Sequence, residues 1–87
     1  MIKVKIKGDD FKPFEIDVKD LNLKERVDLN EILYKMFSNK DGMFGPAIDV
    51  IRFATNISDE EINLFSNEQI FQIAIEISNI VNKKKLK

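Results

Sequence analysis

Carboxylates are the side chains in this sequence with the clearest potential for chemistry. Two groups of neighbouring acids occur, Asp9-Asp10 and Asp59-Glu60-Glu61. Carboxylates that converge in a cleft can act as a general acid and base or bind a divalent metal. Here the first pair suits a predicted turn, and the second group begins a predicted helix, where negative charge interacts favourably with the helix dipole. We therefore expect these acids to have structural roles.

Other residue types on which enzymes rely are scarce. The sequence contains no histidine and no cysteine, which removes the usual general base, the thiolate nucleophile and the commonest metal ligands. Tyr34 is the single tyrosine, and we expect it at the boundary of a helix with its hydroxyl in water. The sequence thus predicts a non-enzymatic protein without a catalytic residue, a metal or another cofactor.

The loop expected over residues 38–45 is a further candidate site. Its glycines precede a helix, as in phosphate-binding loops, but the Gly-Lys-Ser/Thr of such loops is missing. Its first residues are similar to a calcium loop, but Ile48 stands where the bidentate glutamate would be. The loop tip carries Met43 and Phe44, which either tuck under the domain or dock into a partner.

A β-hairpin is the first element expected along the chain. Residues 2–7 alternate apolar side chains with lysines, and residues 13–18 resume the alternation with acids on the polar side. A turn-forming segment separates them, so lysines should face acids across the two strands. Pro13 cannot donate a ladder hydrogen bond and suits a strand start or an edge.

Helices are expected after the hairpin, because capping boxes and apolar spacing mark them. The capping boxes pair Asn22 with Glu25, Ser58 with Glu61 and Ser66 with Gln69. The expected helices cover residues 23–37, 46–55, 59–64 and 67–82. In the first, the core-facing spacing includes Leu29, Ile32, Leu33, Met36 and Phe37. The second has so few polar residues that it should be the central helix.

The predicted fold class is α+β, with the N-terminal hairpin packed on a bundle of three to four helices. The 87 residues suffice for one core and not for two. We expect residues 1–87 to form a single domain, with residues 83–87 as a basic C-terminal tail.

The charge balance argues against binding to nucleic acid or membranes. The net charge is −1, from 14 basic and 15 acidic residues, and no segment has the length and apolarity of a membrane span. Lysines gather at the first strand and at the end of the chain, but no aromatic side chain lies among them for base stacking. We expect solvated lysines, and a small nucleic-acid-associated regulatory protein is the alternative.

Helix caps and apolar spacing recur in four segments. They are Leu23-Lys-Glu-Arg-Val-Asp-Leu-Asn30, Val50-Ile-Arg-Phe-Ala-Thr55, Ile57-Ser-Asp-Glu-Glu-Ile-Asn63 and Leu64-Phe-Ser-Asn-Glu-Gln-Ile-Phe71. In these segments the chain resembles small assembly and virion proteins of tailed bacteriophages, such as tail assembly chaperones. The resemblance implies a phage structural subunit as protein partner, no catalytic residue, and a location in the cytoplasm of the bacterial host or in the virion.

Two surfaces are expected to meet a partner. The hairpin edge with its lysines could add to another sheet, and the last helix has apolar residues beyond its core-facing set, which could pack on a phage subunit or on a second copy of the chain. The candidate partner-binding residues are Lys3, Lys5, Lys7, Met43, Phe44, Phe71 and Ile75.

Overall fold

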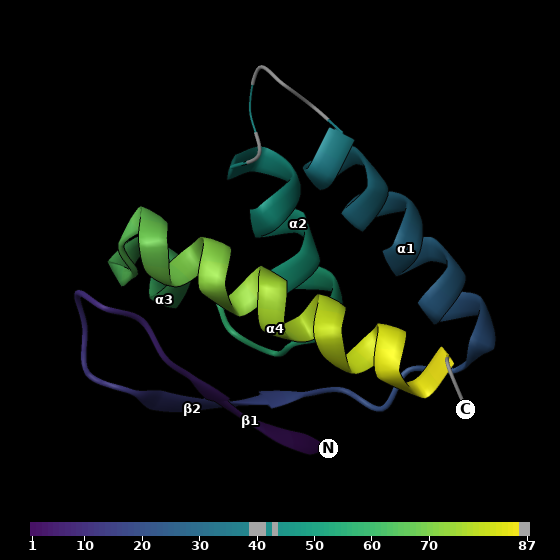
Figure 1. The fold of residues 1–87 in the computed structure, drawn as a ribbon, viewed down its shortest axis with the longest axis horizontal. Helices are drawn as coiled ribbons and strands as arrows, with labels where there is room; N and C mark the ends of the chain where they lie inside the picture. Colours follow the sequence, from purple (N-terminus) through teal and green to yellow (C-terminus); the bar gives the residue numbers. More distant parts are fainter. Residues whose placement is uncertain (39–41, 43, 86–87) are drawn as a thin grey trace.

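The computed structural model describes residues 1–38, 42 and 44–85, and the side chains among these through Val81. It has an antiparallel hairpin followed by helices, which confirms the predicted α+β class (Figure 1). The elements are β1 (Ile2–Ile6), β2 (Phe14–Val18), α1 (Leu23–Ser38), α2 (Phe44–Ala54), α3 (Asp59–Leu64) and α4 (Asn67–Lys85).

The element bounds differ from the predicted ones by a few residues. β2 begins at Phe14, directly after Pro13, because proline cannot donate to the strand ladder. α2 begins at Phe44, so Pro46 lies inside its first turn, where a missing N–H costs nothing. The tail predicted at residues 83–87 is helical as far as Lys85, because lysine favours helices and positive charge is favourable at a helix C-terminus.

The hairpin has the predicted alternation and pairing. Lys3 lies opposite Asp17, and Lys5 lies opposite Glu15. The inward-facing strand residues share one core with the helices, above the hairpin in Figure 1. The buried members on this face are Val4, Ile6, Ile16 and Val18.

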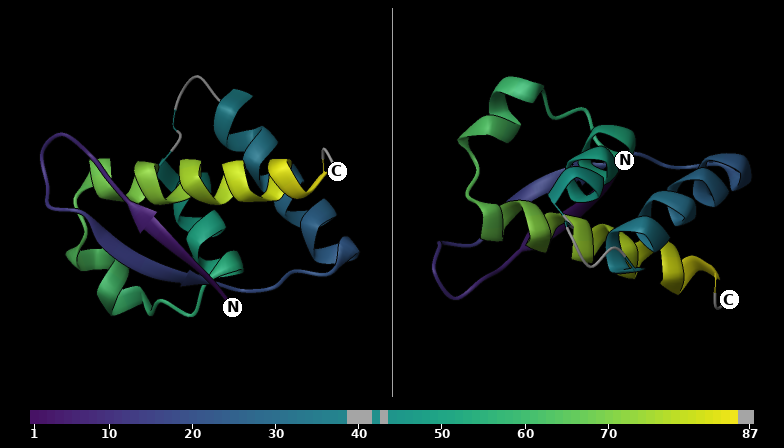
Figure 2. Two further views of the ribbon diagram at one scale, coloured as in Figure 1. Left: turned by 60° about the horizontal axis from the view of Figure 1, so that its bottom comes forward. Right: turned by 90° about the horizontal axis from the view of Figure 1, so that it is seen from above.

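α2 is the central helix, as its composition predicted. It packs against both α1 and α4 (Figure 2). The residues that it buries completely are Ala47, Val50, Ile51 and Ala54. α1 covers it with Leu29, Leu33 and Met36, all buried. The core is therefore formed around α2, and the hairpin covers one side of it.

The predicted helix caps are formed. The N–H of Glu25 donates to Oδ1 of Asn22 at 2.8 Å, and the N–H of Asn22 donates to Oε1 of Glu25 at 3.1 Å. At the other two caps, the N–H of Glu61 donates to Ser58 Oγ at 3.2 Å, and the N–H of Gln69 donates to Ser66 Oγ at 3.2 Å. Each cap satisfies a backbone donor that has no partner within its helix.

A backbone contact fastens the helices to the sheet. Lys19 donates its N–H to the carbonyl oxygen of Ala54 at 2.8 Å, and Val18 forms an antiparallel bridge with Thr55. The residue that follows α2 thus pairs with the last residue of β2, on the side of β2 that faces away from β1. This contact covers one end of the β2 edge.

Candidate protein-binding surface

α1 carries a second apolar face besides the one it buries. Leu23 is 70% exposed, Val27 51%, Tyr34 74% and Phe37 57%. Together with the half-buried Asn30, these residues are spaced by four, three, four and three positions. On a helix this spacing places all five in one row. We call this row the α1 outer stripe.

The α1 outer stripe lies beside the core-facing side of the same helix. Successive residues of α1 are about 100° apart around the helix axis. Leu29, Leu33 and Met36 therefore face the core, and the stripe faces solvent on the neighbouring side. The prediction that Phe37 faces the core is therefore wrong. The Tyr34 side chain is also more exposed than expected for a residue packed at the boundary of the core. Lys24, Asp28, Glu31 and Lys35 lie on the far side of the stripe from the core, whereas Arg26 lies between the core-facing sector and the stripe.

Two shallow grooves follow the α1 outer stripe. The first is lined by Val27, Asn30, Glu31, Tyr34 and Lys35. The second, between α1 and the end of α4, is lined by Leu23, Arg26, Val27, Asn30 and Val81. The grooves show that exposed apolar side chains here border recessed surface, which another protein's side chains could fill.

Three of the predicted partner residues form a separate cluster on α2 and α4. The rings of Phe44 and Phe71 meet edge to face, with centroids 5.9 Å apart. Ile75 lies one helical turn beyond Phe71 and is 36% exposed. Phe44 is 37% exposed, so it packs on α4 while keeping part of its ring in solvent. Met43 lies outside the described residues.

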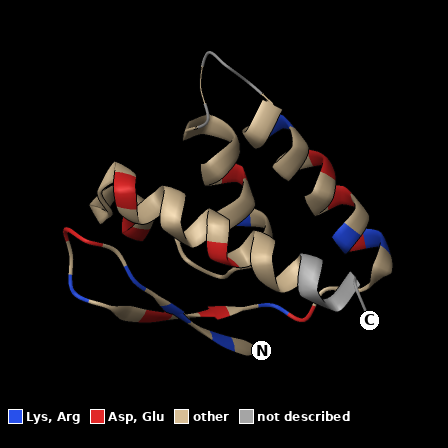
Figure 3. Ribbon diagram, viewed as in Figure 1, with Lys and Arg blue, Asp and Glu red and all other residues tan. Residues whose placement is uncertain are grey.

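The predicted lysines lie on the hairpin. Lys3, Lys5 and Lys7 are all exposed. Carboxylates of β2 lie opposite Lys3 and Lys5, so that basic residues on one strand face acidic residues on the other in Figure 3. The cross-strand acids reduce the positive potential that a phosphate backbone would need. The sequence pattern predicts candidate partner surfaces here and on α4, and it does not predict the α1 outer stripe.

The hairpin turn brings acids close to the start of α4. A hydrogen bond with the Asp10 side chain raises the pKa of Glu68 above its ordinary value of 4.5, with lesser contributions from desolvation and from the charges of Asp10 and Asp9. Within the described ranges, no group of three or more acids is placed to hold a metal ion. The contact therefore brings carboxyl groups of the hairpin turn and of α4 close to one another.

Replacement of Asp10 by asparagine should lower the pKa of Glu68 toward its ordinary value. The Asp10 carboxylate can only accept a hydrogen bond, which favours protonated Glu68, whereas an asparagine amide can donate to ionised Glu68 and carries no charge. A raised folded-state pKa means that protonation of Glu68 favours the fold, and that this contribution disappears as the pH rises through that pKa. An NMR titration of the Glu68 carboxyl in both proteins measures the change. Asp20→Asn is the control, and an equal Glu68 pKa in wild type and Asp10→Asn would contradict the contact.

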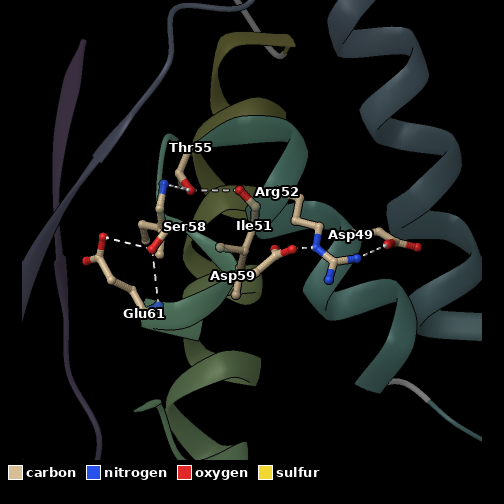
Figure 4. Close-up of polar contacts among 8 residues, drawn as sticks. Asp49, Ile51, Arg52, Thr55, Ser58, Asp59 and Glu61 are labelled. Carbon is tan, nitrogen blue, oxygen red and sulfur yellow. Dashed lines mark hydrogen bonds and ion pairs between the residues drawn. The ribbon is translucent and has the colours of Figure 1, made fainter. Parts of the chain in front are cut away.

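Charged side chains also join α2 to α3, as Figure 4 shows. Arg52 Nε donates to Asp59 Oδ1 at 2.8 Å, and Arg52 Nη1 lies 3.9 Å from Asp49 Oδ1. All three side chains are more than half exposed. Surface pairs of this kind contribute little to stability, and they leave Asp59 in the structural role that its helix start predicted.

Comparisons of the chain with protein-family models, curated proteins and solved structures found no match. None of the helices in the described part of the chain is long and apolar enough to cross a membrane.

Proposed function

We propose that the protein is a non-enzymatic bacteriophage assembly or virion structural protein, either a tail assembly chaperone or a minor structural subunit, that acts through protein–protein contacts. The observation that carries the proposal is the α1 outer stripe. Single exposed apolar residues are ordinary, but a row of them along one helix face is typical of an interaction site. The resemblance to small phage proteins supplies the class of partner.

The mechanism is the burial of a helix face. A helix can place side chains that recur every three or four residues into a groove of another protein or against another helix. Burial of a large apolar side chain contributes about 1.5–3 kcal/mol, and loss of translational and rotational freedom offsets part of this gain. Such an interaction depends on apolar area and so changes little with salt.

Binding to nucleic acid through the lysines has less support. Acids lie opposite Lys3 and Lys5 on the hairpin, and affinity for phosphates needs excess positive charge. The two functions differ in their response to salt, because release of counterions makes phosphate binding fall steeply with ionic strength. Salt therefore distinguishes them in a single experiment.

The test is capture of the tagged protein from bacteria that are assembling phage particles, followed by a nuclease and high-salt wash and mass spectrometry. Wild type should retain a virion structural subunit, and Tyr34→Glu should lose it because a charge enters the α1 outer stripe. Leu64→Glu is the matched control, since Leu64 is 84% exposed on α3, outside the stripe. Equal retention by Tyr34→Glu, or loss of every protein partner of wild type in the nuclease and high-salt wash, would overturn the proposal.

A further inference from the structure

We infer that the α1 outer stripe binds the same stripe of a second copy of this chain, with the two α1 helices antiparallel. The inference rests on the proposed function, because it names the occupant of the same surface. Spacing, charge and position in the fold support it independently of the phage resemblance.

The spacing of the stripe is that of a helix–helix seam. Steps of four and three residues are the a and d positions of a coiled coil, and the stripe keeps them from Leu23 to Phe37. α1 has 16 residues and is therefore about 24 Å long. α1 also forms one side of the molecule in Figures 1 and 2, where another helix can lie along it.

Charges beside the stripe are self-complementary. Lys24 and Glu31 are seven residues apart on α1 and border the stripe on its solvent side. When Leu23 of one copy lies opposite Tyr34 of the other in antiparallel helices, Lys24 of each copy lies beside Glu31 of the other. A twofold axis repeats this contact, so two ion pairs flank the seam. In a parallel pair, Lys24 would face the side of the partner helix that turns toward its own core.

Asn30 and the size of the stripe limit the affinity. In this register Asn30 lies opposite Val27 of the other copy, and a polar residue in a seam lowers stability while it helps to fix the register. One helix face covers less than the roughly 800 Å² per partner of a standard interface. We therefore expect a reversible dimer with a dissociation constant of about 10 µM.

The experiment is sedimentation equilibrium of the purified full chain over a concentration series that spans this value. Wild type should form a reversible dimer, and Val27→Glu should be a monomer throughout. Lys24→Glu and Glu31→Lys should each weaken the dimer about tenfold, because both symmetry-related pairs become repulsive. An equimolar mixture of these two variants should associate with nearly wild-type affinity, because it restores both pairs.

Lys12→Glu provides the matched control for Lys24→Glu, with the same change of charge in the exposed hairpin loop. It should dimerise as wild type does. The substituted side chains are largely exposed, so equal far-UV circular dichroism of all variants should show that folding is retained. A normal dimer of Lys24→Glu would overturn the antiparallel arrangement.

Failure of this inference differs from failure of the proposed function. A wild-type monomer at every concentration, or a mixture that associates no better than its components, overturns the self-association. If Tyr34→Glu still loses its virion partner in that case, the stripe binds another protein and the proposed function stands. If Val27→Glu abolishes the dimer, the inference is supported. If Tyr34→Glu nevertheless retains every captured partner, that second result overturns the proposed function and leaves the inference standing.

Discussion

Truncation of Ile51 to alanine should lower the free energy of unfolding by about 3–4 kcal/mol, the largest effect that we expect from one substitution. Ile51 is completely buried on α2, the helix that packs against both α1 and α4. The substitution removes apolar contacts and leaves a cavity that three tightly packed helices can fill only in part. Small domains have about 5–15 kcal/mol of stability in total, so much of the population would unfold under mild denaturation. Urea titration followed by far-UV circular dichroism measures the change.

Leu64→Ala is the control for Ile51→Ala. Leu64 is 84% exposed on α3, and its truncation should change the free energy of unfolding by no more than about 0.5 kcal/mol. Both variants should be compared at one low protein concentration, because self-association would add stability. A loss below about 1 kcal/mol for Ile51→Ala would mean that α2 is not the centre of the core.

Local signals explain why much of the fold could be predicted. The hairpin follows from alternation in two short segments, and Asn22, Ser58 and Ser66 mark helix starts because their side chains bond within three residues. The central place of α2 followed from its composition, since a helix with few polar side chains needs partners on several sides. These inferences needed no knowledge of which elements pack together.

The candidate protein-binding surface depends on tertiary packing, which the sequence pattern does not specify. The apolar part of α1 is wider than one neighbouring helix covers, and periodicity alone could not tell which sector α2 would take. The spacing therefore predicts Phe37 in the core, although it is 57% exposed. The available signal was a second set of apolar residues at four- and three-residue spacing, from Leu23 to Tyr34.

The loop tip shows the same limit. The sequence does not decide whether the Phe44 side chain packs against its own domain or binds a partner. The structure places its ring against Phe71 of α4, a residue 27 positions further along the chain. Only the packing of α2 on α4 brings these rings together. The contact also leaves exposed surface on Phe44 and Ile75, so the cluster is a second apolar surface, smaller than the α1 outer stripe.

A buried threonine at the end of α2 holds the turn toward α3. Thr55 is 2% exposed. Its hydroxyl donates to the carbonyl oxygen of Ile51 at 2.7 Å and accepts the N–H of Ile57 at 3.2 Å (Figure 4). The backbone of Thr55 also pairs with Val18. One side chain therefore satisfies backbone groups on both sides of the point where helix, strand and turn meet.

Replacement of Thr55 by valine should lower the free energy of unfolding by about 1–3 kcal/mol, because the shape is kept but the N–H of Ile57 loses its acceptor in a partly buried position. Thr55→Ser keeps the hydroxyl and removes one methyl group, at a cost of about 1 kcal/mol. Because the two losses overlap in size, hydrogen exchange of the Ile57 amide separates them. Its protection should fall in Thr55→Val and persist in Thr55→Ser. Equal protection in both variants would mean that the hydroxyl does not hold this turn, and that other contacts, such as the packing of Ile62 and Phe65, position α3.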